Sequence, residues 1–70
     1  MSTIGNAGIG ETHVIRKITG DDRARQHLAE LGFVVGEEIA LVNKAQDDVV
    51  LKVKGTSIAI GASLAKCILI

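Results

Sequence analysis

The chain has 70 residues, the length of one small domain, and 47% of them are hydrophobic and 23% charged, which argues against intrinsic disorder. Eight basic and eight acidic residues give a formal net charge of zero, so the chain lacks the basic excess typical of nucleic-acid binding. Phe33 is the only aromatic residue, so nothing offers a stacking platform for bases. We expect no nucleic-acid partner. We also expect no cofactor, because a deep pocket would leave too little aliphatic core.

Cysteine content and hydropathy indicate the compartment. Cys67 is the only cysteine, so no intrachain disulfide can form, which fits a reducing cytosol. Residues 1–10 carry no basic side chain and no long apolar run, unlike a secretory signal. The most apolar stretch, residues 57–70, contains Lys66 and is shorter than the roughly 20 residues that span a bilayer. We expect a cytoplasmic protein that does not insert into a membrane.

The first part of the chain reads as a lead-in followed by a strand. Residues 1–10 contain three glycines and no charge, which predicts a flexible lead-in whose Ile4 or Ile9 packs on a domain spanning residues 11–70. The β-branched stretch 11–18 predicts a strand. Because Val14 and Ile15 are neighbours, alternation fails there, which indicates a bend or a bulge.

A short helix follows this strand. Asp21 and Asp22 provide a helix start, and the apolar residues recur at helical spacing on one face. Gly32 is placed to take the left-handed conformation that ends a helix, and the next residue can make the apolar contact that accompanies such an end. The residues of the core-facing side are Ala24, Leu28 and Leu31.

The rest of the chain reads as β-structure. Polar or glycine-containing turns separate short apolar stretches, of which the second alternates most cleanly. The predicted strands are 37–43, 49–54, 57–60 and 66–70. The fold class is therefore mainly β: a small barrel of about five strands, with one short α-helix between the first and second strands.

Side chains capable of chemistry are few. His27 and Glu30 lie one helical turn apart and, with His13 or Cys67, offer a composite metal site, but two ligands alone do not close one. Cys67 lies in an apolar strand, which favours burial over nucleophilic catalysis. We therefore expect no metal site and no enzyme. Three lysines, Lys52, Lys54 and Lys66, can share an outer face that is either simply solvated or a patch for an acidic partner.

The segment Leu28-Ala29-Glu30-Leu31-Gly32-Phe33, followed by Gly36, resembles the L-x-x-L-G signature of the FeoA family. The similarity continues through residues 49–53, Gly55, 58–60 and the closing stretch 65–70, so it covers residues 10–70. Two features depart from the family pattern. Val35 stands where a proline is common, and the loop at 46–48 is shorter and lacks proline.

The resemblance implies an SH3-like barrel that acts as a cytosolic accessory to the FeoB ferrous iron transporter. Similar domains end some metal-dependent transcription regulators. The family has no metal-ligand or catalytic motif that could be matched to residues of this chain. We therefore expect an adaptor that binds the cytosolic region of a FeoB-type transporter and modulates iron uptake.

Three successive apolar residues in the loop after the helix are the best candidate for the partner-binding surface, because exposed apolar patches mark interfaces. These are Phe33, Val34 and Val35, with Lys52 and Lys54 as a polar rim. In the alternative, Phe33 plugs the end of the barrel. Two other functions stay open: a metal-binding or metal-sensing module that uses His13, His27, Glu30 or Cys67, and a regulator-like interaction domain with weak self-association.

Overall fold

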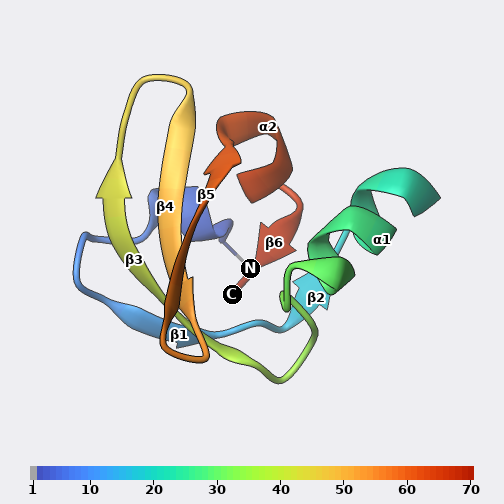
Figure 1. Cartoon of the computed structure of the whole chain (residues 1–70), viewed down its shortest axis with the longest axis horizontal. Helices are drawn as coiled ribbons and strands as arrows, with labels where there is room; N and C mark the ends of the chain where they lie inside the picture. The colour runs from blue at the N-terminus through green and yellow to red at the C-terminus, as the bar shows by residue number, and fades with distance from the viewer. Residues whose placement is uncertain (1) are drawn as a thin grey trace.

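The computed structural model describes residues 2–70 as two small antiparallel sheets with a helix projecting from one side (Figure 1). One sheet has four strands in the order β1-β3-β4-β5, and the other pairs β2 with β6. In chain order the elements are η1 Ile4–Asn6, β1 Thr12–Val14, β2 Lys17–Ile18, α1 Asp22–Glu30, β3 Glu38–Lys44, β4 Asp48–Val53, β5 Thr56–Gly61, α2 Ala62–Ala65 and β6 Ile68–Leu69.

The single strand expected over residues 11–18 is two strands that belong to different sheets. Ile15 exchanges backbone hydrogen bonds with the β3 side: its amide donates to Glu37 at 2.9 Å, and its carbonyl accepts from Gly36 at 2.8 Å. The next amide, of Arg16, donates instead to Leu69 at 2.8 Å. The chain thus changes sheets between residues 15 and 16. This confirms the expected bend. Val14 is exposed and Ile15 is buried because neighbouring residues of a strand point to opposite faces of the sheet.

The three longest strands, β3, β4 and β5, each place one face in the core. Inward positions alternate with outward ones along β3, β4 and β5, and a bulge between Leu41 and Asn43 interrupts the β3–β4 register. The alternation predicted for residues 49–54 is confirmed. The buried core comprises Ile4, Ala7, Ile15, Leu28, Phe33, Ile39, Leu41, Val49, Leu51, Val53, Ile60, Ala65 and Ile68.

Helix α1 forms as its end signals predict. The Asp21 carboxylate accepts a hydrogen bond from the Ala24 amide at 2.8 Å, which satisfies one free donor of the first turn. Gly32 has φ +100° just after the helix, as expected for a left-handed end. Of the predicted inner face, Leu28 is completely buried, while Ala24 and Leu31 are half-buried. The helix therefore touches the barrel mainly through its last turn.

The N-terminal segment packs on the barrel through Ile4, one of the two isoleucines expected to do so. Ile4 lies in η1 and is 0% exposed, whereas Ile9 is 61% exposed. Thr3 bridges to Leu69, and the Ile70 amide donates to the Ser2 carbonyl at 2.8 Å. The first residues thus share an edge with the last strand.

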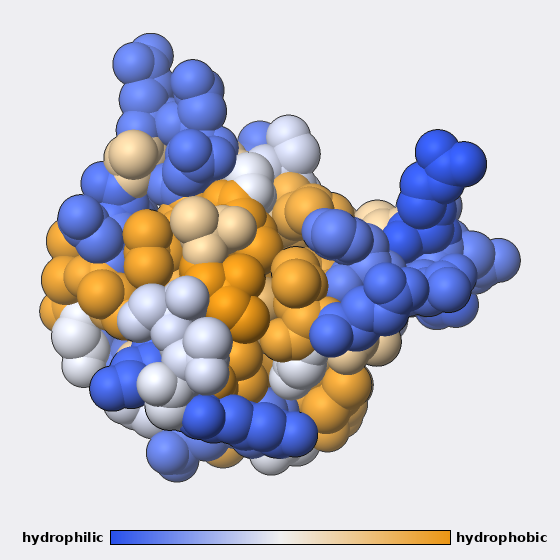
Figure 2. All heavy atoms as spheres, in the orientation of Figure 1, coloured by the Kyte–Doolittle hydropathy of each residue, from blue (hydrophilic) through white to orange (hydrophobic). Residues whose placement is uncertain are grey.

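The mainly-β prediction is confirmed, with six strands in residues 2–70 where about five were expected. Helix α2 was not anticipated, and it follows directly on β5. Hydrophilic side chains cover α1 and the tip of the β3–β4 hairpin, while apolar ones gather over the middle of the face between them (Figure 2). Within residues 2–70, no helix has the length and hydropathy to cross a membrane.

Candidate partner-binding surface

The loop between α1 and β3 carries the three apolar residues predicted to bind a partner, and the structure separates them. Phe33 is 1% exposed, Val34 is 41% exposed and Val35 is 62% exposed. Phe33 thus follows the alternative in which it fills the barrel, and two of the three apolar residues are exposed. The reason lies in the helix end: the amides after α1 bond back to its last carbonyls, which turns Phe33 into the core.

This loop lies beside the hairpin that joins β4 to β5. A Cβ placed on Gly32 would lie 3.8 Å from Val53 Cγ1, so the start of the loop packs on the end of β4. At the other end of the loop, Glu37 Oε2 lies 3.9 Å from Lys54 Nζ. The structure thus brings the exposed valine pair and Lys54 to one end of the barrel.

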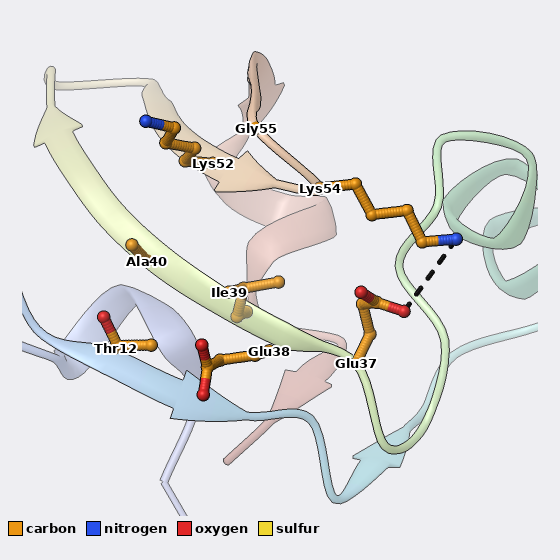
Figure 3. A pocket seen from close by; sticks show the side chains of 8 residues that line it. All are labelled: Thr12, Glu37, Glu38, Ile39, Ala40, Lys52, Lys54 and Gly55. Atoms are coloured by element: carbon orange, nitrogen blue, oxygen red, sulfur yellow. Dashed lines mark ion pairs between the residues drawn. The ribbon is translucent and has the colours of Figure 1, made fainter.

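A shallow hollow of about 320 Å³ lies on the outer face of the sheet at the same end (Figure 3). Lys54 turns toward Glu37, whereas the ammonium of Lys52 points away from that ion pair. Two carboxylates and two lysines give this surface both signs of charge, which suits the polar rim of a protein interface. The hollow is lined by Thr12, Glu37, Glu38, Ile39, Ala40, Lys52, Lys54 and Gly55.

Sequence reasoning missed the two glutamates of this hollow and misplaced one lysine. Glu38 follows Glu37 at the start of β3, and the pairing of β3 with β4 brings both near the lysines. The alternation of residues 49–54 could have identified the two glutamates, because it indicates the register of the β3–β4 hairpin and thus which residues lie beside the lysines. Lys66 does not join Lys52 and Lys54: it lines a separate hollow with Thr3 and Lys44.

The candidate metal ligands occupy separate places. His13 on β1 donates through Nε2 to Glu11 Oε1 at 2.8 Å, and this hydrogen bond is the main cause that lowers the pKa of Glu11. His27 lines a hollow between α1 and α2. Cys67 Sγ lies 3.8 Å from the Ser63 carbonyl oxygen. Among residues 2–70, no group of three or more His, Cys, Asp and Glu side chains is arranged to hold a metal ion.

Exposed aliphatic side chains also occur elsewhere. In the described part of the chain, the large hydrophobic residues that are exposed are Ile9, Val14, Val34, Val35 and Val42. Val34 and Val35 are neighbours in sequence and lie in a loop, where no strand partner restricts their approach to another protein. They are therefore the strongest apolar candidate.

Comparisons with known proteins identify relatives over nearly the whole length. The model of the FeoA domain family matches residues 3–70. A protein of Methanocaldococcus jannaschii with the provisional name Fe(2+) transport protein A is 31% identical over 61 residues, which cover 87% of this chain and 74% of that protein.

Solved structures agree with this match. A crystal structure of FeoA, described as an iron uptake regulatory protein, has a TM-score of 0.86 at 27% identity and covers 96% of this chain and 89% of its own. The Stenotrophomonas maltophilia FeoA, an SH3-domain protein crystallised with zinc, has a TM-score of 0.84 at 27% identity and covers 99% and 88%.

A manganese-dependent transcriptional repressor shares the fold alone, with a TM-score of 0.87 at 13% identity over 94% of this chain and 38% of that one. The SH3-like barrel expected from the sequence is thus confirmed. The N-terminal boundary of the match, residue 3, agrees with the packing of Ile4 in the core. The chain therefore belongs to the FeoA domain family, an accessory family of ferrous iron transport.

Proposed function

We propose that this protein is a cytoplasmic adaptor that binds the cytosolic region of a FeoB-type ferrous iron transporter and modulates iron uptake. Membership of the FeoA family supports a role in ferrous iron transport. So does the relative from Methanocaldococcus jannaschii, which carries the name of an Fe(2+) transport protein. The adaptor acts by surface contact and does not act as an enzyme.

The observation that carries the proposal is the exposed Val34–Val35 pair. The two side chains project from a loop whose neighbours on both sides are fixed: Phe33 is buried, and the Gly36 amide donates to the Ile15 carbonyl at 2.8 Å. A fixed loop with exposed aliphatic groups offers apolar anchors at a low entropic cost of binding. The surrounding charges of Glu37, Lys52 and Lys54 form the rim.

The test replaces the two valines one at a time. Val34→Asp and Val35→Asp each place a charge in the apolar centre of the interface, so we expect each to weaken binding to the transporter's cytosolic region by at least about tenfold. Calorimetric titration measures the affinity, and a thermal melt shows that each variant is folded. Val42→Asp is the matched control, because Val42 on β3 is also 41% exposed but lies outside this loop.

The control should bind like the wild type. Folded Val34→Asp and Val35→Asp proteins with unchanged affinity would exclude this surface. A wild-type protein that shows no binding to the transporter region would contradict the adaptor function itself. The metal-binding alternative predicts instead that Fe²⁺ alone, under anaerobic conditions, binds the isolated protein and shifts the NMR signals of His13, His27, Glu30 or Cys67.

A further inference from the structure

We propose that the free edge of β5 is a docking site for an extended acidic segment of the partner, which adds to the sheet as a further strand. This inference rests on the proposed adaptor function and names how the partner is held. Its main contacts are the backbone groups of Ser57 and Ala59, and Lys52 supplies the complementary charge.

The hairpin geometry shows which backbone groups are free. Lys54 and Gly55 connect β4 to β5 with φ +52° and +79°, the pattern of a type I′ turn. In such a hairpin the flanking residues, Val53 and Thr56, form a hydrogen-bonded pair, and bonded and non-bonded pairs then alternate. Ser57 and Ala59 therefore fall at non-bonded positions, where their amides and carbonyls point away from β4.

No other part of the structure uses these groups. β5 is the last strand of its sheet, and within residues 2–70 neither Ser57 nor Ala59 has a hydrogen-bond partner beyond that edge. Both residues are exposed. The outward amides and carbonyls are thus a ready template for another strand.

The edge also lacks the features with which proteins usually protect such strands. Its sequence, Thr-Ser-Ile-Ala-Ile-Gly, contains no charge and no proline, and its register with β4 is unbroken over all six residues. The other edge strand of the sheet, β1, has only three residues. An unprotected edge of this length can therefore accept a partner strand.

Charge favours an acidic segment as the occupant. Lys52 stands opposite Ser57 on the outer face, is exposed, and forms no ion pair within the described residues. A strand added beyond β5 would lie two strand spacings, roughly 10 Å, from β4. The small Ser57 side chain leaves the long lysine free to reach across it toward a carboxylate. The strand itself is neutral, and Asp48 stands opposite Gly61 at its far end, so the acidic residues of the segment belong beside Ser57.

The opposite side of an added strand would face apolar surface. Ile58 points inward and is half-buried, and the apolar area in the middle of Figure 2 lies in the region of β5. An added strand therefore needs acidic and apolar residues in alternation. One end of the added strand would lie beside the Lys54–Gly55 turn. This end would come close to the Val34–Val35 loop, because Glu37, at the end of that loop, pairs with Lys54.

The experiment uses overlapping 12-residue peptides from the transporter's cytosolic region as probes. Each is titrated into ¹⁵N-labelled protein, and amide hydrogen exchange is measured with and without peptide. We expect an acidic-apolar peptide to slow exchange at Ser57 and Ala59 by at least about tenfold, because the outward amides become hydrogen-bonded. The other edge provides the internal reference at Thr12.

Two proline variants form a matched pair. Ala59→Pro removes an outward amide without breaking a bond to β4, so the fold is retained and peptide affinity falls by at least about tenfold. Val14→Pro makes the same change on β1, where the pairing of His13 with Ile39 leaves Val14 at an outward position, and should bind like the wild type. Lys52→Gln should weaken binding roughly two- to fivefold, as the loss of an exposed ion pair does.

The outcomes separate this inference from the proposed function. If the intact transporter region binds and Ala59→Pro binds it as tightly as the wild type, the β5 edge is not the docking site, while the adaptor function stands. If the transporter region does not bind at all, both are overturned. If exchange at Ser57 and Ala59 slows with protein concentration in the absence of peptide, a second copy occupies the edge, and the acidic-segment proposal is wrong.

Discussion

The backbone amide of Phe33 donates to the carbonyl of Leu28 at 2.9 Å, and the side chains of both residues are buried in the same core. Between them, the Gly32 amide donates to the Ala29 carbonyl at 3.0 Å. This pair of hydrogen bonds is the Schellman arrangement, and it requires the residue at position 32 to be left-handed. The end of α1 therefore decides which of the following residues enters the core and which two face solvent.

The first prediction concerns the conformation at position 32. Gly32→Ala should lower the free energy of unfolding by about 1 kcal/mol or more, because φ +100° disfavours any residue with a Cβ. Steric conflict is not the cause, since the new Cβ would make an ordinary contact with Val53. Gly32→Asn should cost less, because asparagine tolerates the left-handed region. Urea denaturation measures the free energy of unfolding of both variants, and an alanine variant as stable as the wild type would refute this account.

The second prediction concerns the buried face of α1. Leu28→Ala should cost about 2–5 kcal/mol, because Leu28 is fully buried and the helix has little other contact with the barrel. Gln26→Ala on the exposed side is the control and should change stability by less than about 0.5 kcal/mol. Equal denaturation midpoints for the two variants would show that the helix does not dock as described.

The third prediction compares two isoleucines of the N-terminal segment. Ile4→Ala should destabilise the protein by about 2–5 kcal/mol, because Ile4, the first residue of η1, is fully buried in the core. Ile9→Ala should have almost no effect, since Ile9 is exposed. Chemical denaturation of both variants tests whether the first residues belong to the folded unit. Similar stabilities would mean that this segment contributes nothing to the core in solution.

The fourth prediction concerns Glu11. The hydrogen bond from His13 lowers the pKa of the Glu11 carboxyl, with a smaller contribution from the Gly8 amide. The stabilisation is therefore present above the unfolded-state pKa and is lost as the pH falls through the lower folded-state value. His13→Ala should raise the pKa of Glu11 toward its ordinary value. A ¹³C NMR titration of the carboxyl measures it, and an unchanged pKa would show that the pair does not form in solution.

Local signals made α1 predictable from the sequence. Its capping aspartate, its helical spacing and its terminal glycine act within a few residues of one another, and the structure follows each of them. The alternation of buried and exposed residues in β4 was equally predictable from the sequence. By contrast, α2 has only four residues, Ala62–Ala65, and no side-chain cap, so its helical conformation depends on packing rather than on local preference.

At the candidate surface, some features follow from local signals and others from strand pairing. Phe33, Val34 and Val35 are all apolar, but the helix end predicted at Gly32 gives the next residue an apolar contact, and the hydrogen bonds at the end of α1 place Phe33 in the core. The proximity of Lys54 to Glu37 and the free edge of β5 arise instead from strand pairing, which composition and spacing do not specify.

The second sheet has a consequence for how the protein folds. β2 pairs with β6, joining Lys17 to Leu69 and Ile18 to Ile68, so this sheet closes a loop of about 50 residues. The hairpins of β3, β4 and β5 need only neighbouring segments and can form early. Pairing β2 with β6 instead brings distant segments together, which costs more conformational entropy. The meander of β3, β4 and β5 should therefore assemble first, and the rate-limiting event should be the pairing of residues 68–69 with the strand at 17–18.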